Sequence, residues 1–183
     1  AASRELKIRV DIHPKLIDIR DPNLFNYPVV FMHGRNAFRL TDQERERLRT
    51  YVERGGVLLA DSICGNQAFT ESFRREMAAT FPQHPMERIP ASDPIWTKQY
   101  GGFDLPTVGR RDPQPSTAGE PLRAAVRNVP PELEAVRFGD RYGVIFSPYD
   151  LSCALEKHDS LECRGYVRED AAKIGLNILL YAV

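Results

Sequence analysis

The chain has 183 residues, 42% of them hydrophobic and 9% aromatic, which is enough to bury one core and predicts a single domain over residues 1–183. Lysine plus arginine and aspartate plus glutamate both number 25, so the formal net charge is zero. Without a basic stripe to neutralise phosphates, we expect no nucleic-acid partner. The most apolar run, 174-IGLNILLYAV-183, is about half the roughly 20 residues that a membrane helix needs, so we expect no membrane span.

Three cysteines, Cys64, Cys153 and Cys163, occur without a C-x-x-C motif and without the Cys/His spacing of a structural zinc site. The sequence therefore predicts free thiols, no metal and no cofactor. The chain begins 1-AASRELKIRV-10 without an initiator methionine, which indicates a processed or excised piece of a longer chain.

The first half of the chain alternates strands and helices. The apolar run 28-PVVFMHG-34 predicts a buried strand, and 41-TDQE-44 has the capping-box form that begins a helix. Gly55 or Gly56 can end that helix, and a second strand follows from Val57 to Ala60. A second helix buries aromatic and methionine side chains at intervals of four and stops before a proline: Phe69, Phe73, Met77, Phe81 and Pro82.

The second half contains a hairpin, a helix and a long polar segment. Segment 136–147 predicts a hairpin that turns at Gly139-Asp140, and residues 168–181 predict a largely buried helix. Residues 101–131 are rich in proline, glycine and charge, and we expect a mobile loop there. Strands and helices that alternate over short connections indicate an open α/β sheet with mostly parallel strands.

The carboxyl ends of parallel strands meet at one edge of such a sheet, where ligands usually bind. In this chain those ends are 32-MHGRN-36, 61-DSICGNQ-67 and 147-SPYD-150, so we expect one ligand crevice there. Its candidate ligand-binding residues are His33, Gly34, Asp61, Cys64, Asn66 and Asp150.

Each candidate also has a structural interpretation. His33 can simply bond a loop carbonyl, and the Asp61 carboxylate can cap the turn or the next helix. Cys64 precedes a helix N-terminus, which favours a thiolate, but an inert cysteine in a turn is the alternative. A catalytic pair of Cys64 and His33 stays open, and so does a metal site that uses His33 and Asp61 with a further histidine.

Segments 27–77, 89–96 and 165–183 together resemble the bacterial family called domain of unknown function 4159. More distantly, the pattern L-T-x-x-E with a later G-G-V is similar to the trehalose-utilisation protein A family and to the class I glutamine amidotransferase fold. This resemblance implies a flavodoxin-like three-layer α/β/α sandwich with a mostly parallel sheet and one long loop insertion.

Class I amidotransferases use a cysteine on a tight elbow and a histidine and glutamate in a late F-H-P-E turn. The segment 62-SICGNQ-67 resembles the elbow loosely, and the late turn reads 146-FSPYD-150. Ser147 and Tyr149 occupy the histidine and glutamate positions, so the resemblance implies a broken triad.

The favoured hypothesis is a non-catalytic module that senses a small polar ligand or binds a protein partner. The alternatives are a Cys64-dependent or metal-assisted hydrolase, and a carbohydrate-binding domain that uses Trp96, Tyr100 and Phe103. The sequence does not fix the compartment, although the bacterial envelope or periplasm is favoured over the cytoplasm.

Overall fold

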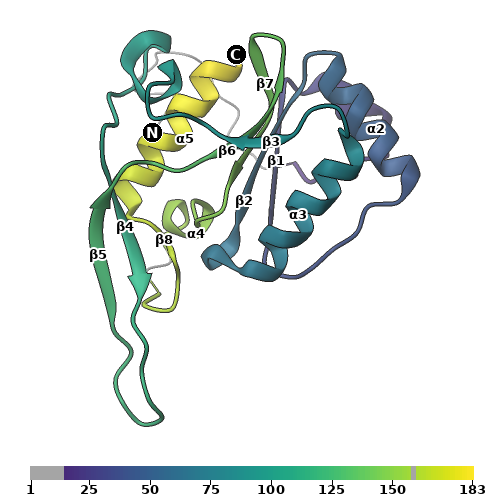
Figure 1. Ribbon diagram of the computed structural model, residues 1–183. Coiled ribbons are helices and arrows are strands. Elements are labelled where there is room, and N and C mark those ends of the chain that lie inside the picture. Colours follow the sequence, from purple (N-terminus) through teal and green to yellow (C-terminus); the bar gives the residue numbers. More distant parts are fainter. Residues whose placement is uncertain (1–14, 158–159) are drawn as a thin grey trace.

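A computed structural model describes residues 15–157 and 160–183, and Figure 1 shows two β-sheets with helices packed against the larger one. The larger sheet has the strand order β1-β2-β7-β6-β3, and the smaller sheet has the order β5-β4-β8. The larger sheet contains β1 (Val29–Gly34), β2 (Val57–Ser62), β3 (Met86–Arg88), β6 (Glu134–Phe138) and β7 (Arg141–Ser147). The smaller sheet contains β4 (Val108–Pro113), β5 (Ala124–Val129) and β8 (Gly165–Tyr166).

The helices are α2 (Asp42–Glu53), α3 (Gln67–Thr80), the short α4 (Ser152–Leu155) and α5 (Arg168–Ala182). The described residues also contain four short 3-10 helices: η1 (Pro22–Asn26), η2 (Ile63–Gly65), η3 (Pro94–Trp96) and η4 (Lys98–Tyr100). Over the described ranges, none of these helices has the length and apolar character that crossing a bilayer requires.

Strands β1, β2 and β7 form the parallel part of the larger sheet. Val29 lies opposite Val57 at one end of the β1–β2 pair, and Gly34 lies opposite Ser62 at the other. This register confirms the prediction that the strands at 29–32 and 57–60 are parallel neighbours. Strand β7 pairs with β2 on its other side, also in parallel, so β2 is buried along its whole length.

Helices α2 and α3 cover one face of this sheet (Figure 1). The capping box predicted for α2 is present, because the Thr41 hydroxyl accepts from the Glu44 amide and the Glu44 carboxylate accepts from the Thr41 amide at 2.7 Å. Helix α3 buries Phe69, Phe73 and Met77 against the sheet, as the spacing predicts. These local signals are satisfied in the fold, and so both helices form where the sequence places them.

Helix α5 covers the opposite face and holds the segment that follows η3. Ala171, Ile174 and Ile178 are fully buried in the core on that face. The buried Asn177 side chain accepts from the Phe103 amide at 2.8 Å and donates to the carbonyls of Ile95 and Phe103. This amide satisfies main-chain groups that would otherwise be buried without partners, and it fixes the chain between η3 and β4 against the helix.

The expected flavodoxin-like, mostly parallel sandwich of the class I glutamine amidotransferase type is wrong. Four of the six strand pairings are antiparallel, namely β3–β6, β6–β7, β4–β5 and β4–β8. The hairpin predicted at Gly139-Asp140 accounts for part of this difference, because a two-residue turn makes β6 and β7 antiparallel, whereas parallel strands need a crossover. The chain is a mixed α/β fold with two sheets.

Residues 101–131, expected to be a loop insertion, contain the β4–β5 hairpin. Val108 pairs with Val129 and Pro113 with Ala124, and β8 adds to the other side of β4. Five of the six prolines lie outside the paired residues. Charged residues inside the strands form ion pairs, as Arg110 and Arg127 do with the buried Asp112. The hairpin projects from the body in Figure 1. The prediction of one domain over 1–183 stays a prediction.

We expect amide hydrogen exchange to be slow in one part of residues 101–131 and fast in another. Amides of β4, which is paired on both sides, should exchange slowly, whereas residues 115–122 at the tip should exchange fast because few backbone bonds protect them. Peptide-resolved exchange mass spectrometry measures both. Fast exchange throughout 101–131 would instead support a mobile loop.

Candidate functional site

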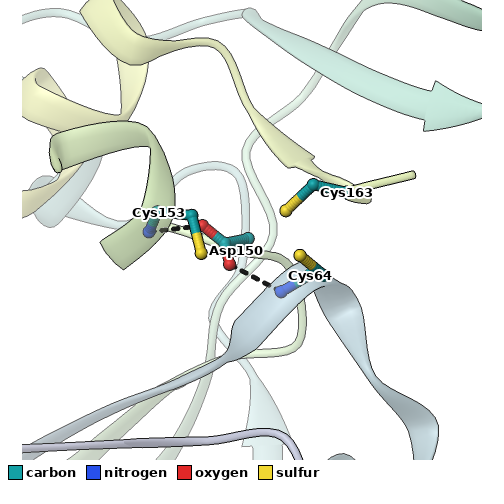
Figure 2. A group of neighbouring side chains, drawn as sticks. All are labelled: Cys64, Asp150, Cys153 and Cys163. Atoms are coloured by element: carbon teal, nitrogen blue, oxygen red, sulfur yellow. Dashed lines mark hydrogen bonds between the residues drawn. The ribbon is translucent and has the colours of Figure 1, made fainter. Parts of the chain in front are cut away.

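Three segments meet beyond the ends of β2 and β7. Cys64 lies in η2 after β2, Asp150 and Cys153 follow β7, and Cys163 lies just before β8. The three sulfur atoms and one carboxylate oxygen of Asp150 all lie within 4.8 Å of one another. Figure 2 shows the thiols of Cys64 and Cys163 facing each other, with the Cys153 thiol beside the Asp150 carboxylate. We call these four residues the thiol–carboxylate cluster.

The Asp150 carboxylate organises the cluster through backbone hydrogen bonds. One of its oxygens accepts from the Cys64 amide at 2.5 Å, and the other accepts from the Cys153 amide at 2.8 Å and the Ala154 amide at 3.4 Å (Figure 2). Asp150 is 1% exposed. Since a carboxylate is an acceptor with room for several donors, this one side chain joins the turn after β2 to the first turn of α4.

Main-chain hydrogen bonds hold the third segment against the other two. The Arg164 amide donates to the Cys64 carbonyl at 3.3 Å, the Asp150 amide donates to the Arg164 carbonyl at 3.1 Å, and the Tyr166 amide returns to the Asp150 carbonyl at 3.1 Å. Gly165 permits this approach, because a Cβ there would lie 2.5 Å from the Asp150 Cβ. The position of Cys163 is therefore set by the fold.

Cys64 has a left-handed backbone, with φ 54° and ψ 23°. A non-glycine residue seldom adopts this conformation, which costs on the order of 1 kcal/mol. Gly65 follows, also at positive φ, and a Cβ there would come within 3.0 Å of the Arg164 carbonyl oxygen. Two successive left-handed residues turn the chain sharply, and the bond from the Cys64 amide to Asp150 stabilises that turn.

Asp61 is not part of the cluster, but it bonds the residues that follow Asp150. Its Oδ2 atom accepts from the amides of Leu151 and Ser152 at 2.9 and 3.1 Å, and from the Ser152 hydroxyl at 3.1 Å. Its Oδ1 atom is buried without a hydrogen-bond partner in the described structure. Burial raises the pKa of Asp61, the bonds from Leu151 and Ser152 oppose the rise, and the charge of nearby Asp150 adds to it. Asp61 thus positions the loop that carries Asp150.

The other predicted site residues lie elsewhere or have structural roles. His33 is in edge strand β1, where its ring stacks on Phe31 with centroids 5.2 Å apart, and it is not part of the cluster. Gly34 is needed for packing, because a Cβ there would collide with the Phe69 ring. Asn66 caps α3 by accepting from the Ala68 amide at 2.9 Å.

Ser147, for which the amidotransferase resemblance implied a histidine position, donates from its hydroxyl to the Tyr149 carbonyl at 2.6 Å. The serine is fully buried, and this bond lies within its own turn.

The thiols of the cluster differ in burial. Cys163 is buried, whereas Cys64 and Cys153 are partly exposed. Desolvation, followed by the hydrogen bond and charge of Asp150, raises the pKa of Cys153 to about 12. Desolvation also raises the pKa of Cys163, with the neighbouring Cys64 thiol as the next cause. Both shifts favour the protonated thiol.

Sequence reasoning identified Cys64, Asp61 and Asp150 for this region but missed Cys153 and Cys163. The available signal was the D-x-x-C spacing from Asp150 to Cys153, in which the aspartate caps a short helix that carries the cysteine. Nothing local linked Cys163 to the other residues.

The family model described as domain of unknown function DUF4159 matches residues 1–183. The chain therefore belongs to this family. The match does not extend to the trehalose-utilisation proteins or the amidotransferases, and no curated protein matches the sequence.

Asp61→Asn should change how stability depends on pH. The pKa of Asp61 is raised in the folded protein, so above about pH 4 the folded state binds more protons than the unfolded chain. This residue therefore makes the free energy of unfolding fall as the pH rises towards the raised pKa. The asparagine does not titrate, and that part of the fall should disappear. Urea denaturation between about pH 4 and pH 8 measures it. Identical pH profiles for both proteins would contradict the assignment.

Asp150→Ala should destabilise the fold by about 2–4 kcal/mol, because it leaves the Cys64 and Cys153 amides without their acceptor. Asp150→Asn keeps one acceptor oxygen and should cost less. Chemical denaturation of the reduced proteins measures both losses. Equal stability of wild type and Asp150→Ala would show that the carboxylate does not hold the turn.

Proposed function

We propose that this domain is a non-catalytic binding module whose ligand site is the thiol–carboxylate cluster. The observation that carries the proposal is the convergence of three thiols from three segments around one buried carboxylate, held by backbone bonds. A ligand that bridges these segments would directly affect the backbone conformation of the turn after β2 and of α4. This supports the sensing interpretation favoured by the sequence.

The groups around Cys64 argue against an acyl-transfer nucleophile. Such a thiol needs a general base within hydrogen-bond reach to take up its proton. The structure describes two histidines, and neither joins the cluster: His33 is in the edge strand, and His84 stacks on Phe138 and bonds the Arg137 carbonyl. The Asp150 carboxylate is already an acceptor for backbone amides. No observation favours the cysteine- or metal-assisted hydrolase with His33.

The carbohydrate hypothesis loses its main support, because the Trp96 ring is not presented to solvent. Trp96 is 3% exposed and its indole nitrogen donates to the Pro90 carbonyl at 3.0 Å. The Tyr100 ring packs edge-on against Tyr181. These aromatic residues stabilise the core around α5 and leave no flat face of the tryptophan for a sugar.

The test compares wild type with Cys64→Ser in the hydrolysis of p-nitrophenyl acetate, an activated ester that acylates catalytic thiols. We expect equal rates, no burst of nitrophenolate and no acetyl group on Cys64 by mass spectrometry, because neither histidine in the described residues joins the cluster to act as a base. Cys153→Ser serves as a matched control for the loss of a thiol at the same site. A stoichiometric burst that disappears only in Cys64→Ser would overturn the non-catalytic assignment.

A further inference from the structure

The cluster has the dimensions of a site for a single metal ion. Its four candidate donor atoms lie within 4.8 Å of one another. In a tetrahedral zinc site, Zn–S bonds of about 2.3 Å and Zn–O bonds of about 2.0–2.2 Å place neighbouring ligand atoms roughly 3.3–3.8 Å apart. Small side-chain rotations would therefore bring these atoms onto one ion, without moving any strand.

The donor set selects a particular class of ion. Thiolates are soft ligands that prefer Zn²⁺, Cu⁺ or iron–sulfur clusters over Mg²⁺ and Ca²⁺. Zn²⁺ also accepts a carboxylate oxygen as a ligand, whereas Cu⁺ prefers soft ligands. The Asp150 oxygen that accepts from the Cys64 amide keeps a second lone pair, so the residue can bind an ion there and still hold the turn.

Charge also favours a cation at this position. In the described part of the chain, the buried Asp150 carboxylate has backbone amides as its hydrogen-bond donors and forms no ion pair with lysine or arginine. A second buried carboxyl group, that of Asp61, accepts from the amide of Leu151, the residue that follows Asp150. Buried acidic groups are usually compensated by a cationic side chain or a metal, and here a divalent ion would supply that charge.

The ligands come from a framework that does not depend on the ion. Backbone bonds join residues 64, 150 and 164 to one another, and the Asp150 carboxylate orients the peptides that carry two of the cysteines. Such outer contacts are what hold metal ligands in position in known sites. The cysteines are thus preorganised, although they are far apart in sequence.

We propose that Cys64, Cys153, Cys163 and Asp150 bind one Zn²⁺ ion with four protein ligands, and that this ion is the ligand of the binding module. The inference rests on the function proposed above. Binding replaces the thiol protons, which are released to solvent, and the ion links the turn after β2 to α4 and to the start of β8. A set of four protein ligands is typical of structural and sensing zinc sites, whereas catalytic sites keep one position open.

The experiment titrates Zn²⁺ into reduced, chelator-treated protein in competition with a chromophoric chelator. We expect one equivalent to bind with an affinity tighter than micromolar, accompanied by proton release. Cys64→Ser, Cys153→Ser and Cys163→Ser should each weaken binding by on the order of a hundredfold or more, at least the loss seen when an outer partner is removed. The control is His84→Ala, which removes a histidine that is not part of the cluster. This variant should bind Zn²⁺ as tightly as wild type.

A measurement on the wild-type protein tests the zinc site even if the serine variants do not fold. Co²⁺ added to the unmodified protein should give the intense charge-transfer absorption of tetrahedral thiolate coordination, and Zn²⁺ should protect all three thiols from alkylation. Failure to bind either ion, or serine variants that fold and bind as tightly as wild type, would overturn the zinc site. If the ester test shows no acylation, failure to bind zinc contradicts only the zinc site and not the proposed non-catalytic binding module. Acylation of Cys64 in the ester test would contradict the binding module.

Discussion

The Asp150 carboxylate is the interaction on which the site depends. It accepts from the amide of a strained left-handed residue, Cys64, and from the Cys153 and Ala154 amides in the first turn of α4. The Asp150 main chain also bridges to Gly165 in a parallel arrangement, which connects the larger sheet to the smaller one. Asp150 thus joins three segments, two through its side chain and the third through its main chain. Loss of the carboxylate would leave main-chain donors without partners in a region with little access to water.

The site lies where two kinds of sheet meet. Parallel strands β2 and β7 end side by side, which brings the turn after β2 next to the loop after β7. The antiparallel β4–β8 pair then directs the chain before β8 across these two ends. Helices α3 and α4 begin at this edge, and free amides at helix N-termini favour anions. Here Asn66 and Asp150 accept from amides of these first turns, and the thiols beside Asp150 give the edge donor atoms that suit a cation.

The surroundings of Cys153 differ from those of an activated cysteine. An activated thiol lies next to a base or a positive charge, which lowers its pKa. In this protein, burial and the neighbouring carboxylate raise the pKa of Cys153, and Ser147 uses its hydroxyl within its own turn. The arrangement is unfavourable for nucleophilic attack and favourable for a ligand that brings positive charge.

The sequence by itself determined the features that are encoded locally: the strand at 29–34, the capped helix after Thr41, the hairpin at Gly139-Asp140 and the buried helix α5. Each follows from periodicity or hydrogen bonds within a few residues. Only the tertiary structure decided that 101–131 forms a hairpin and that Cys163 joins Cys64. The position of Cys163 depends on the pairing of β4 with β8 and on the bridge from Asp150 to Gly165. This pairing leaves no periodic signal, because β8 has two residues and its partners lie far away in the chain. The β4–β5 hairpin lacks the short turn signal seen at Gly139-Asp140, because residues 114–123 separate its strands.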